Sequence, residues 1–171
     1  MKIKKTLLVT FKTITAVAAV LIFYFTLNST VSSDYTVSSA KGSEFFLTAH
    51  RGLSSIMPEN TLEAFREAAK YNYYALECDV HCTTDGKWVV IHDYMLQAMA
   101  KEKGDVKNWS YEDLKKVKFT NGANIEKYPD AGVCLVEEFI EICKEANIKP
   151  MIEVKDKRIS KVKSLLDIIR A

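Results

Sequence analysis

Apolar residues along the chain are grouped in the pattern of a strand, a helix and a second strand. The run at residues 44–49, EFFLTA, is typical of a short buried strand. Asn60 and Glu63 then form a capping box, with Asn60 as the N-cap of a helix that has an apolar stripe. Residues 75–80 are the next strand-like segment. This order predicts a βαβ unit with parallel strands and a right-handed crossover.

The same alternation continues in the second half of the chain. Ser110 caps a short helix predicted over residues 111–117, and residues 135–146 carry the apolar face of a longer helix. Residues 149–154 predict another strand, followed by an amphipathic helix over residues 159–169. Parallel strands that alternate with helices indicate a barrel or an open α/β sheet.

The N-terminal segment differs from the rest of the chain. Four lysines among the first twelve residues precede an uncharged run at 13–33, whose apolar centre is residues 14–27. Its length lies between that of a secretory leader and that of a membrane-spanning helix. We expect residues 1–33 to be an uncleaved anchor with the lysines inside, and a cleaved leader is the alternative. Residues 34–44 are then a linker, and 45–171 an extracytoplasmic domain.

Charge and cysteine content narrow the function of that domain. The whole chain has a net charge of +2, but residues 45–171 hold 19 basic and 20 acidic side chains. This near balance argues against a nucleic-acid-binding protein. The four cysteines permit three disulfide pairings, among which the sequence does not choose. We expect at least two of them to be buried free thiols.

The stretch ECDVHCTTDGKWVVIHD, residues 77–93, predicts a hairpin that brings polar groups together. Asp85 and Gly86 are typical of a two-residue type I′ turn. Counting outward from that turn places Asp79 opposite His92 on one face of the hairpin. Glu77 shares that face, because side chains alternate along a strand. Burying two carboxylates costs several kcal/mol unless a cation or hydrogen-bond donors compensate.

Three motif groups carry a resemblance to a known family. AHRGLSSIMPENTLEAFREA, ECDVHCTTDGKWVVIHD and MIEVK occur in order between about residues 47 and 155. Together they resemble the N-terminal half of the glycerophosphodiester phosphodiesterases, which are phospholipase-C-like phosphodiesterase barrels. The resemblance implies an α/β fold that is a partial (β/α)8 TIM barrel, roughly its first half, preceded by an N-terminal hydrophobic helix. A full barrel needs about 250 residues, and about 127 follow the linker.

The resemblance also implies roles for matched residues. Glu77, Asp79 and Glu153 correspond to ligands of a divalent cation, Ca²⁺ or Mg²⁺. Three carboxylates without a thiolate or an imidazole suit such a hard cation. His50 and His92 correspond to a general acid/base pair whose individual roles stay open. The phosphate-binding residues implied by the resemblance are Arg51 and Lys155, although Lys155 has the alternative task of orienting Glu153.

Several nearby residues have structural explanations. Asn60 is explained as a helix cap, and Asp85 as a turn former. Asp93 has the role of holding the His92 ring by a hydrogen bond. His81 matches no motif position of the family, so we expect an ordinary surface or hydrogen-bonded histidine. The loop after Asp93, YMLQAMAKEKGDVKNW, departs from the family pattern, which leaves substrate contacts from it open.

The sequence motifs and the length of the domain predict two alternative functions. The first is metal-dependent hydrolysis of glycerophosphodiesters to glycerol 3-phosphate and an alcohol by an anchored enzyme. The second is a non-catalytic, membrane-tethered half-barrel that needs a partner chain. An open barrel edge would favour association with that chain or with a second copy. The expected partners are a small phosphodiester and the membrane, without nucleic acid.

Overall fold

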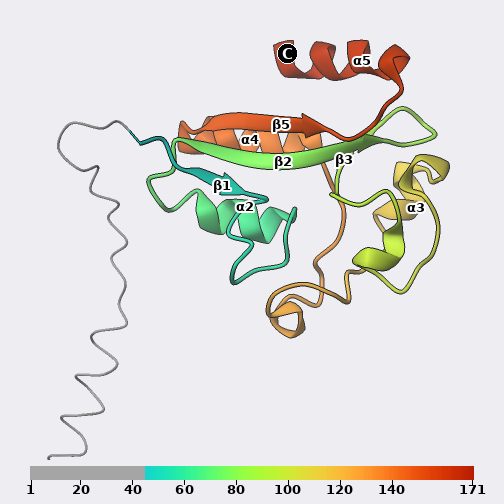
Figure 1. Cartoon of the computed structure of the whole chain (residues 1–171), viewed down its shortest axis with the longest axis horizontal. Helices are drawn as coiled ribbons and strands as arrows, with labels where there is room; N and C mark the ends of the chain where they lie inside the picture. Colours follow the sequence, from blue (N-terminus) through green and yellow to red (C-terminus); the bar gives the residue numbers. More distant parts are fainter. Residues whose placement is uncertain (1–44) are drawn as a thin grey trace, which may run out of the picture. The chain divides into compact units, whose positions relative to one another are not determined.

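The computed structural model describes residues 45–171 (Figure 1). The predicted anchor at 1–33 and the predicted linker at 34–44 lie outside the described residues. The helices and strands follow in this order: β1 Thr48–His50, α2 Leu62–Ala68, β2 Ala75–Cys82, β3 Trp88–Val90, η1 Leu96–Ala98, η2 Val106–Asn108, α3 Tyr111–Leu114, η3 Ile125–Lys127, β4 Cys134–Leu135, α4 Val136–Ala146, β5 Lys149–Val154 and α5 Ile159–Arg170. Within the described part of the chain, no helix has the length and apolar character needed to cross a membrane.

Three strands of the sheet run parallel, with β2 in the middle. β2 pairs with β1 and β5 over the same residues, from Ala75 to Glu77, so its two neighbours lie on opposite edges. Helix α2 follows β1 and α5 follows β5, while α4 follows β4 and precedes β5 in the chain. The predicted α/β alternation is therefore confirmed. The long segment between β2 and α4, which contains the antiparallel strands β3 and β4, accounts for much of the remaining length.

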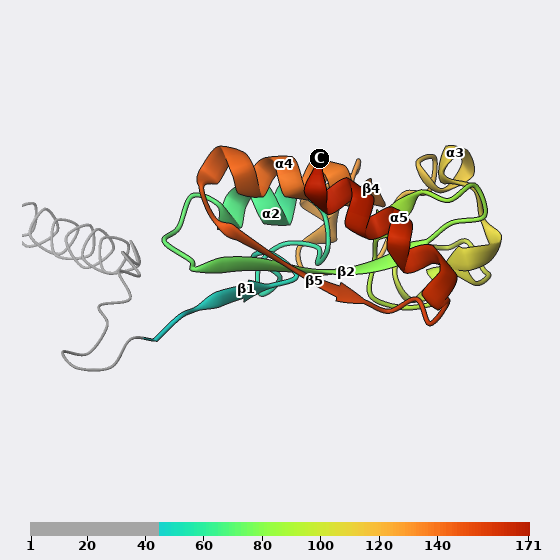
Figure 2. The same cartoon turned by 90° about the horizontal axis from the view of Figure 1, so that it is seen from above.

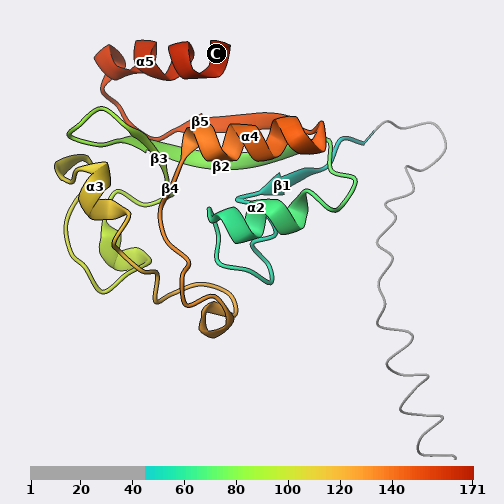
Figure 3. The same cartoon turned by 180° about the vertical axis from the view of Figure 1, so that it is seen from behind.

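Helices α2 and α4 cover one face of this sheet, while α5 lies beyond the β5 edge and packs Leu165 into the same core, as Figures 2 and 3 show for the helices. Alternate residues of β2, such as Cys78 and Val80, point into this layer, where they pack with Phe65 of α2 and Phe139 of α4. The two phenyl rings meet edge to face with centroids 4.7 Å apart. Burial of these side chains is the main source of stability for the layer. The other face of β2 is left for polar groups.

All four cysteines lie in this helix-covered core as free thiols. The prediction of buried free thiols is thus confirmed for Cys78, Cys82, Cys134 and Cys143. Burial raises the pKa of each thiol, and that of Cys143 reaches about 12. They are therefore uncharged at neutral pH and pack as small apolar side chains.

The predicted start of α2 is wrong by one residue. Thr61, not Asn60, is the N-cap, and its side chain accepts a hydrogen bond from the Ala64 amide at 3.2 Å. Asn60 adopts a left-handed conformation with φ 56°. Its side chain is buried and turned away from the helix. An asparagine tolerates this conformation better than most residues, so the chain can turn there before the helix begins.

The predicted register of the β2–β3 hairpin is also wrong by one residue. Cys82 pairs with Trp88, and the connection is a five-residue loop at 83–87 in place of a two-residue turn. The Thr83 hydroxyl stabilises this wider loop, because it accepts from the Lys87 amide at 2.9 Å and donates to Asp85. A shift of one residue reverses the faces of a strand. Ile91, whose amide donates to the Asp79 carbonyl at 3.0 Å, therefore lies beside Asp79 in place of His92.

The prediction of a buried strand at residues 44–49 is correct only at its end, because β1 begins at Thr48 and the three apolar residues before it are exposed. The other elements agree closely with the sequence pattern. The Ser110 side chain caps α3 as predicted, although the helix ends at Leu114 and not at residue 117. The strand β5 has the predicted bounds, and α5 extends one residue further than predicted. The stretch between Asp93 and Ser110 contains two 3₁₀ turns, η1 and η2, that the pattern missed. These turns pack over Val89 and Ile91 in a second apolar cluster.

Candidate active site

Three carboxylates meet on the face of the sheet that the helices leave free. Asp79 of β2 pairs in register with Glu153 of β5, and Glu77 lies two residues before Asp79 on the same face. One ligand oxygen from each lies within 4.8 Å of the others. Glu77 and Asp79 are buried, while Glu153 is exposed. The structure thus brings together the three acidic residues that the sequence singled out.

This acidic group fits a hard divalent cation. Glu77 Oε1 is a buried oxygen without a hydrogen-bond partner among the described residues, whereas Asp79 Oδ1 has only the Lys155 ammonium, 3.2 Å away, as a partner. Burial raises the pKa of the Glu77 carboxyl, and the adjacent Asp79 adds to that shift. Unpartnered carboxylate oxygens in a buried site are costly unless a cation compensates them. An all-oxygen donor set is the kind that Ca²⁺ and Mg²⁺ prefer.

Two basic side chains border the acidic group. Arg51 Nε lies 3.2 Å from Asp79 Oδ2. Lys155 Nζ lies 2.6 Å from Glu153 Oε1 and 3.2 Å from Asp79 Oδ1. The bond with Glu153 raises the pKa of the Lys155 ammonium, which is therefore charged at neutral pH. Both residues have the position and charge to contact an anion bound beside the carboxylates, and Lys155 also orients Glu153.

Asn60 and Glu59 belong to the site, although the pattern of the sequence suggested no chemical role for them. Asn60 Nδ2 donates to Asp79 Oδ2 at 2.9 Å, and its Oδ1 accepts from the Asp79 amide at 3.3 Å. Glu59 receives two hydrogen bonds from Arg51 Nη1, at 3.0 and 3.1 Å. Both residues stand in the PENT motif, directly after the loop that follows His50. Their motif membership was the signal that could have identified them.

The two predicted acid/base histidines are placed differently. His50, at the end of β1, has its Nε2 atom 3.9 Å from Glu77 Oε2, and its side chain is 64% exposed. His92 is partly buried, with Nδ1 3.3 Å from Asp93 Oδ1. Among the described carboxylates, only that of Asp93 lies within ion-pairing distance of the His92 ring. The predicted pairing of His92 with Asp79 is therefore wrong, because the five-residue loop shifts the register and places Ile91 beside Asp79.

Comparison with known proteins decides the family of the chain. The family model described as the glycerophosphoryl diester phosphodiesterase family matches residues 50–168. The chain belongs to the glycerophosphoryl diester phosphodiesterase family. The match begins at the first candidate histidine and extends into α5, so it includes every candidate site residue.

Relatives within the family are similar over part of their length. A glycerophosphodiester phosphodiesterase of Bacillus altitudinis is 38% identical over 97 residues, which cover 55% of this chain and 38% of the relative. One of Caldanaerobacter subterraneus is 34% identical over 111 residues, which cover 63% and 44%. A structure of an Oleispira antarctica phosphodiesterase in complex with sn-glycerol-3-phosphate has a TM-score of 0.68 at 23% identity, covering 74% of this chain and 52% of that one. The chain therefore has the fold of the family. It spans between 38% and 52% of the length of these three relatives.

His81 of this family member is a buried structural histidine and not a surface one. Its ring is 1% exposed, and it packs edge to face on Tyr94 with centroids 4.8 Å apart. Nε2 lies 3.0 Å from the backbone oxygen of His92, which can only accept, so this nitrogen carries the proton. Burial lowers the pKa of His81, which keeps the ring neutral near pH 7. Of the two predicted alternatives for His81, the hydrogen-bonded one is confirmed.

Proposed function

We propose that this glycerophosphoryl diester phosphodiesterase family member hydrolyses glycerophosphodiesters to glycerol 3-phosphate and an alcohol. The observation that carries this proposal is the group of three carboxylates, two of them buried, in which Glu77 Oε1 has no hydrogen-bond partner among the described residues. The names of the relatives and the product bound to the Oleispira antarctica phosphodiesterase support the choice of substrate. Glu77, Asp79 and Glu153 would hold Ca²⁺ or Mg²⁺.

The protein residues divide the work at the phosphodiester. A bound divalent cation neutralises phosphate charge and lowers the pKa of a nearby hydroxyl or water. Arg51 and Lys155 hold phosphate oxygens, Arg51 with its planar fork and Lys155 as a point charge. His50 and His92 transfer protons to and from the attacking and leaving oxygens, since imidazole titrates near neutral pH. Glu59 and Asn60 keep Arg51 and Asp79 in place.

The test is turnover of glycerophosphocholine by the purified full chain with Ca²⁺ or Mg²⁺. We expect EDTA to abolish release of glycerol 3-phosphate, and His50→Ala and His92→Ala to slow it by about 10²- to 10⁴-fold. Glu77→Gln should remove metal binding in calorimetry. Glu141→Gln changes an exposed carboxylate on α4 and serves as the matched control. Turnover that survives EDTA, or that Glu77→Gln leaves unchanged, would reject the proposal.

A specific feature favours the second candidate function, a non-catalytic half-barrel that needs a partner chain. The strand β5 pairs with β2 on one edge only among the described strands, and its apolar residues Met151 and Val154 are 49% and 39% exposed. Such an edge is a template for pairing with a second copy or another chain. Absent turnover together with a stable dimer in sedimentation analysis would favour this function. A monomeric, active chain would exclude it.

We also propose, from the sequence pattern, that residues 1–33 anchor the protein in a membrane and that 34–44 link this anchor to an extracytoplasmic domain at 45–171. The lysines before the apolar run support the orientation. A cleaved, secreted form is the alternative. Protease treatment of intact cells distinguishes them, because a membrane-bound domain that resists external protease would contradict the orientation, and release into the medium would indicate the secreted form.

A further inference from the structure

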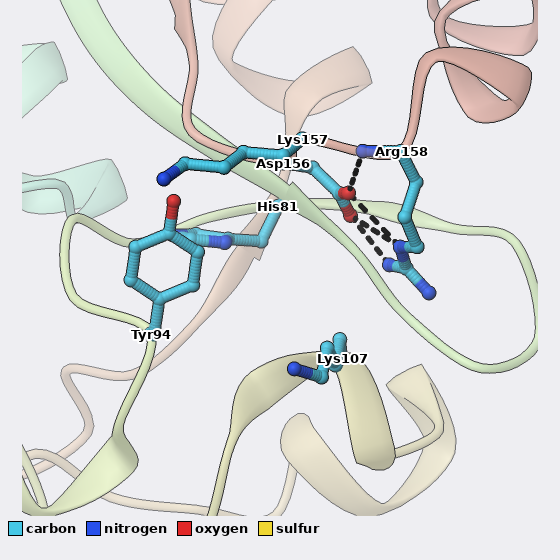
Figure 4. Close-up of a pocket in the computed structure, with 6 residues that line it drawn as sticks. All are labelled: His81, Tyr94, Lys107, Asp156, Lys157 and Arg158. Atoms are coloured by element: carbon cyan, nitrogen blue, oxygen red, sulfur yellow. Dashed lines mark hydrogen bonds and ion pairs between the residues drawn. The ribbon is translucent and has the colours of Figure 1, made fainter.

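A pocket of about 220 Å³ is lined by residues that follow the acidic group along β2 and in the segment after β5. Its lining residues are His81, Tyr94, Lys107, Asp156, Lys157 and Arg158 (Figure 4). Glu77, Asp79 and His81 alternate along β2 and therefore share one face of the sheet. Two residues of a strand span about 7 Å, so the His81 end of the pocket is about that far from Asp79. The proposed chemistry uses none of the six lining residues.

Two side chains of the pocket lining donate hydrogen bonds to backbone carbonyls of proposed active-site residues. The Tyr94 hydroxyl donates to the Lys155 carbonyl at 2.7 Å. The His81 ring donates to the His92 carbonyl at 3.0 Å. Hydrogen bonds therefore connect the pocket lining directly to the backbone of two residues of the proposed active site. A group attached to a phosphate beside Asp79 can enter the pocket without leaving this face of the sheet.

Positive charge predominates in the pocket lining, which contains three cationic side chains and one carboxylate. Asp156 holds Arg158 through bonds to Nε at 2.9 and 3.1 Å. Lys107 pairs with Asp105 at 2.8 Å, outside the lining. Lys157 is exposed and forms no ion pair with any carboxylate of the described chain. Figure 4 shows its side chain extended over the His81 ring toward the Tyr94 hydroxyl, while the Arg158 guanidinium points away from both.

We propose that this pocket receives the alcohol portion of the glycerophosphodiester, and that Lys157 makes it select alcohols bearing a second phosphate over cationic ones such as choline. The inference rests on the proposed function for the position of the first phosphate. An ammonium is a compact charge donor that pairs well with a phosphate and repels a quaternary ammonium. Lys107 and Arg158 add to the positive field of the pocket, although each already has a carboxylate partner.

The experiment compares three compounds that differ in the charge of the alcohol: glycerophosphocholine, glycerophosphoglycerol and bis(glycerophospho)glycerol. Their dissociation constants are measured by calorimetry on the full chain carrying His50→Ala, with Ca²⁺ present, so that turnover does not consume them. We expect bis(glycerophospho)glycerol to bind about fivefold or more tightly than glycerophosphocholine. High salt should remove most of this difference. Lys157→Gln should bring the three constants together. Lys144→Gln removes an exposed charge from α4 and should leave the order unchanged.

The outcomes separate this inference from the proposed function. Equal constants for the three compounds, tighter binding of the choline compound through the Tyr94 ring, or no binding at all would overturn the pocket assignment. An order that Lys157→Gln leaves intact would overturn it as well. If the order depends on Lys157 but the unmodified chain releases no glycerol 3-phosphate from any of the three, the pocket assignment stands and the hydrolase function fails.

Discussion

Asn60 illustrates how a single polar side chain acquires its role from a distant partner. Its buried amide contacts both the side chain and the backbone of Asp79, 19 residues away. These two bonds fix the position of the carboxylate and satisfy Oδ2, while Oδ1 lies 3.2 Å from the Lys155 ammonium on the side of the other two carboxylates. Asn60 therefore positions a metal ligand and does not itself touch the reacting atoms.

We predict that Asn60→Ala weakens Ca²⁺ or Mg²⁺ binding by about 10- to 100-fold, because an unsupported Asp79 loses its orientation. Calorimetric titration with each metal measures this change, and thermal unfolding in EDTA measures any separate loss of stability. Asn108→Ala, at an exposed asparagine of η2, is the control and should bind metal normally. Metal affinity that stays the same in Asn60→Ala would show that the amide only stabilises the fold.

The loop between β1 and α2 packs closely against the α2 backbone. Gly52 adopts φ +77°, and a Cβ at this position would lie 2.7 Å from the backbone carbon of Ala64 in α2. The following amide, of Leu53, donates to the Ala64 carbonyl at 3.1 Å. The loop after His50 therefore packs tightly against α2. Arg51, the residue before Gly52, lies in this loop with its Nε atom 3.2 Å from Asp79 Oδ2.

We predict that Gly52→Ala lowers the free energy of unfolding by about 3 kcal/mol or more, since the left-handed backbone and the overlap with Ala64 both add to the cost. Gly86→Ala is a matched control, because Gly86 has a similar φ of +80° but no atom near its would-be Cβ. It should cost only about 1 kcal/mol. Urea unfolding of both variants measures the difference, and equal losses would show that the close approach to α2 has no energetic effect.

At the scale of the whole domain, Asp156 ties the end of β2 to the segment that leads into α5. Its carboxylate accepts from the Cys82 amide at 3.2 Å and from Arg158 Nε at 2.9 Å, and Arg158 also bonds the Cys82 carbonyl. Burial acts to raise the pKa of Asp156, but the bonds from Arg158 and Cys82 outweigh it and lower the pKa to about 2. The contact therefore requires the ionised carboxylate.

We predict that this contact contributes about 2 kcal/mol of stability at neutral pH. Because the folded pKa lies below the unfolded value of about 3.9, the contribution is complete above about pH 4 and is lost as the pH falls through 2. Asp156→Asn should remove it, so the difference in unfolding free energy from the unmodified chain should shrink across that range. Asp130→Asn, at an ion pair whose carboxylate is 88% exposed, should change stability by less than about 0.5 kcal/mol. A difference for Asp156→Asn that is independent of pH would contradict the ionic origin.

At the scale of the whole molecule, the acidic group could be predicted from the sequence, whereas the position of His92 could not. Glu77 and Asp79 share a face because alternation is a property of one strand, and Glu153 joins them because parallel strands end at the same edge of a sheet. The position of His92 depends instead on how many residues the hairpin loop contains. Thr83, through its bonds to Lys87 and Asp85, enlarged that loop and changed the register by one residue.

By itself, the sequence determined the alternation of strands and helices, the burial of the cysteines and the residue types that meet at the site. These follow from local periodicity and from the chemistry of each side chain. Only the tertiary structure decided the register of β2 with β3, the cap of α2, the partnership of Asn60 with Asp79, and the pocket under Lys157. The partnership of Asn60 with Asp79 and the pocket depend on contacts between residues far apart in the chain, whose energies local patterns do not contain. The register and the cap depend on a choice between competing local hydrogen bonds that the hydrophobic pattern does not resolve.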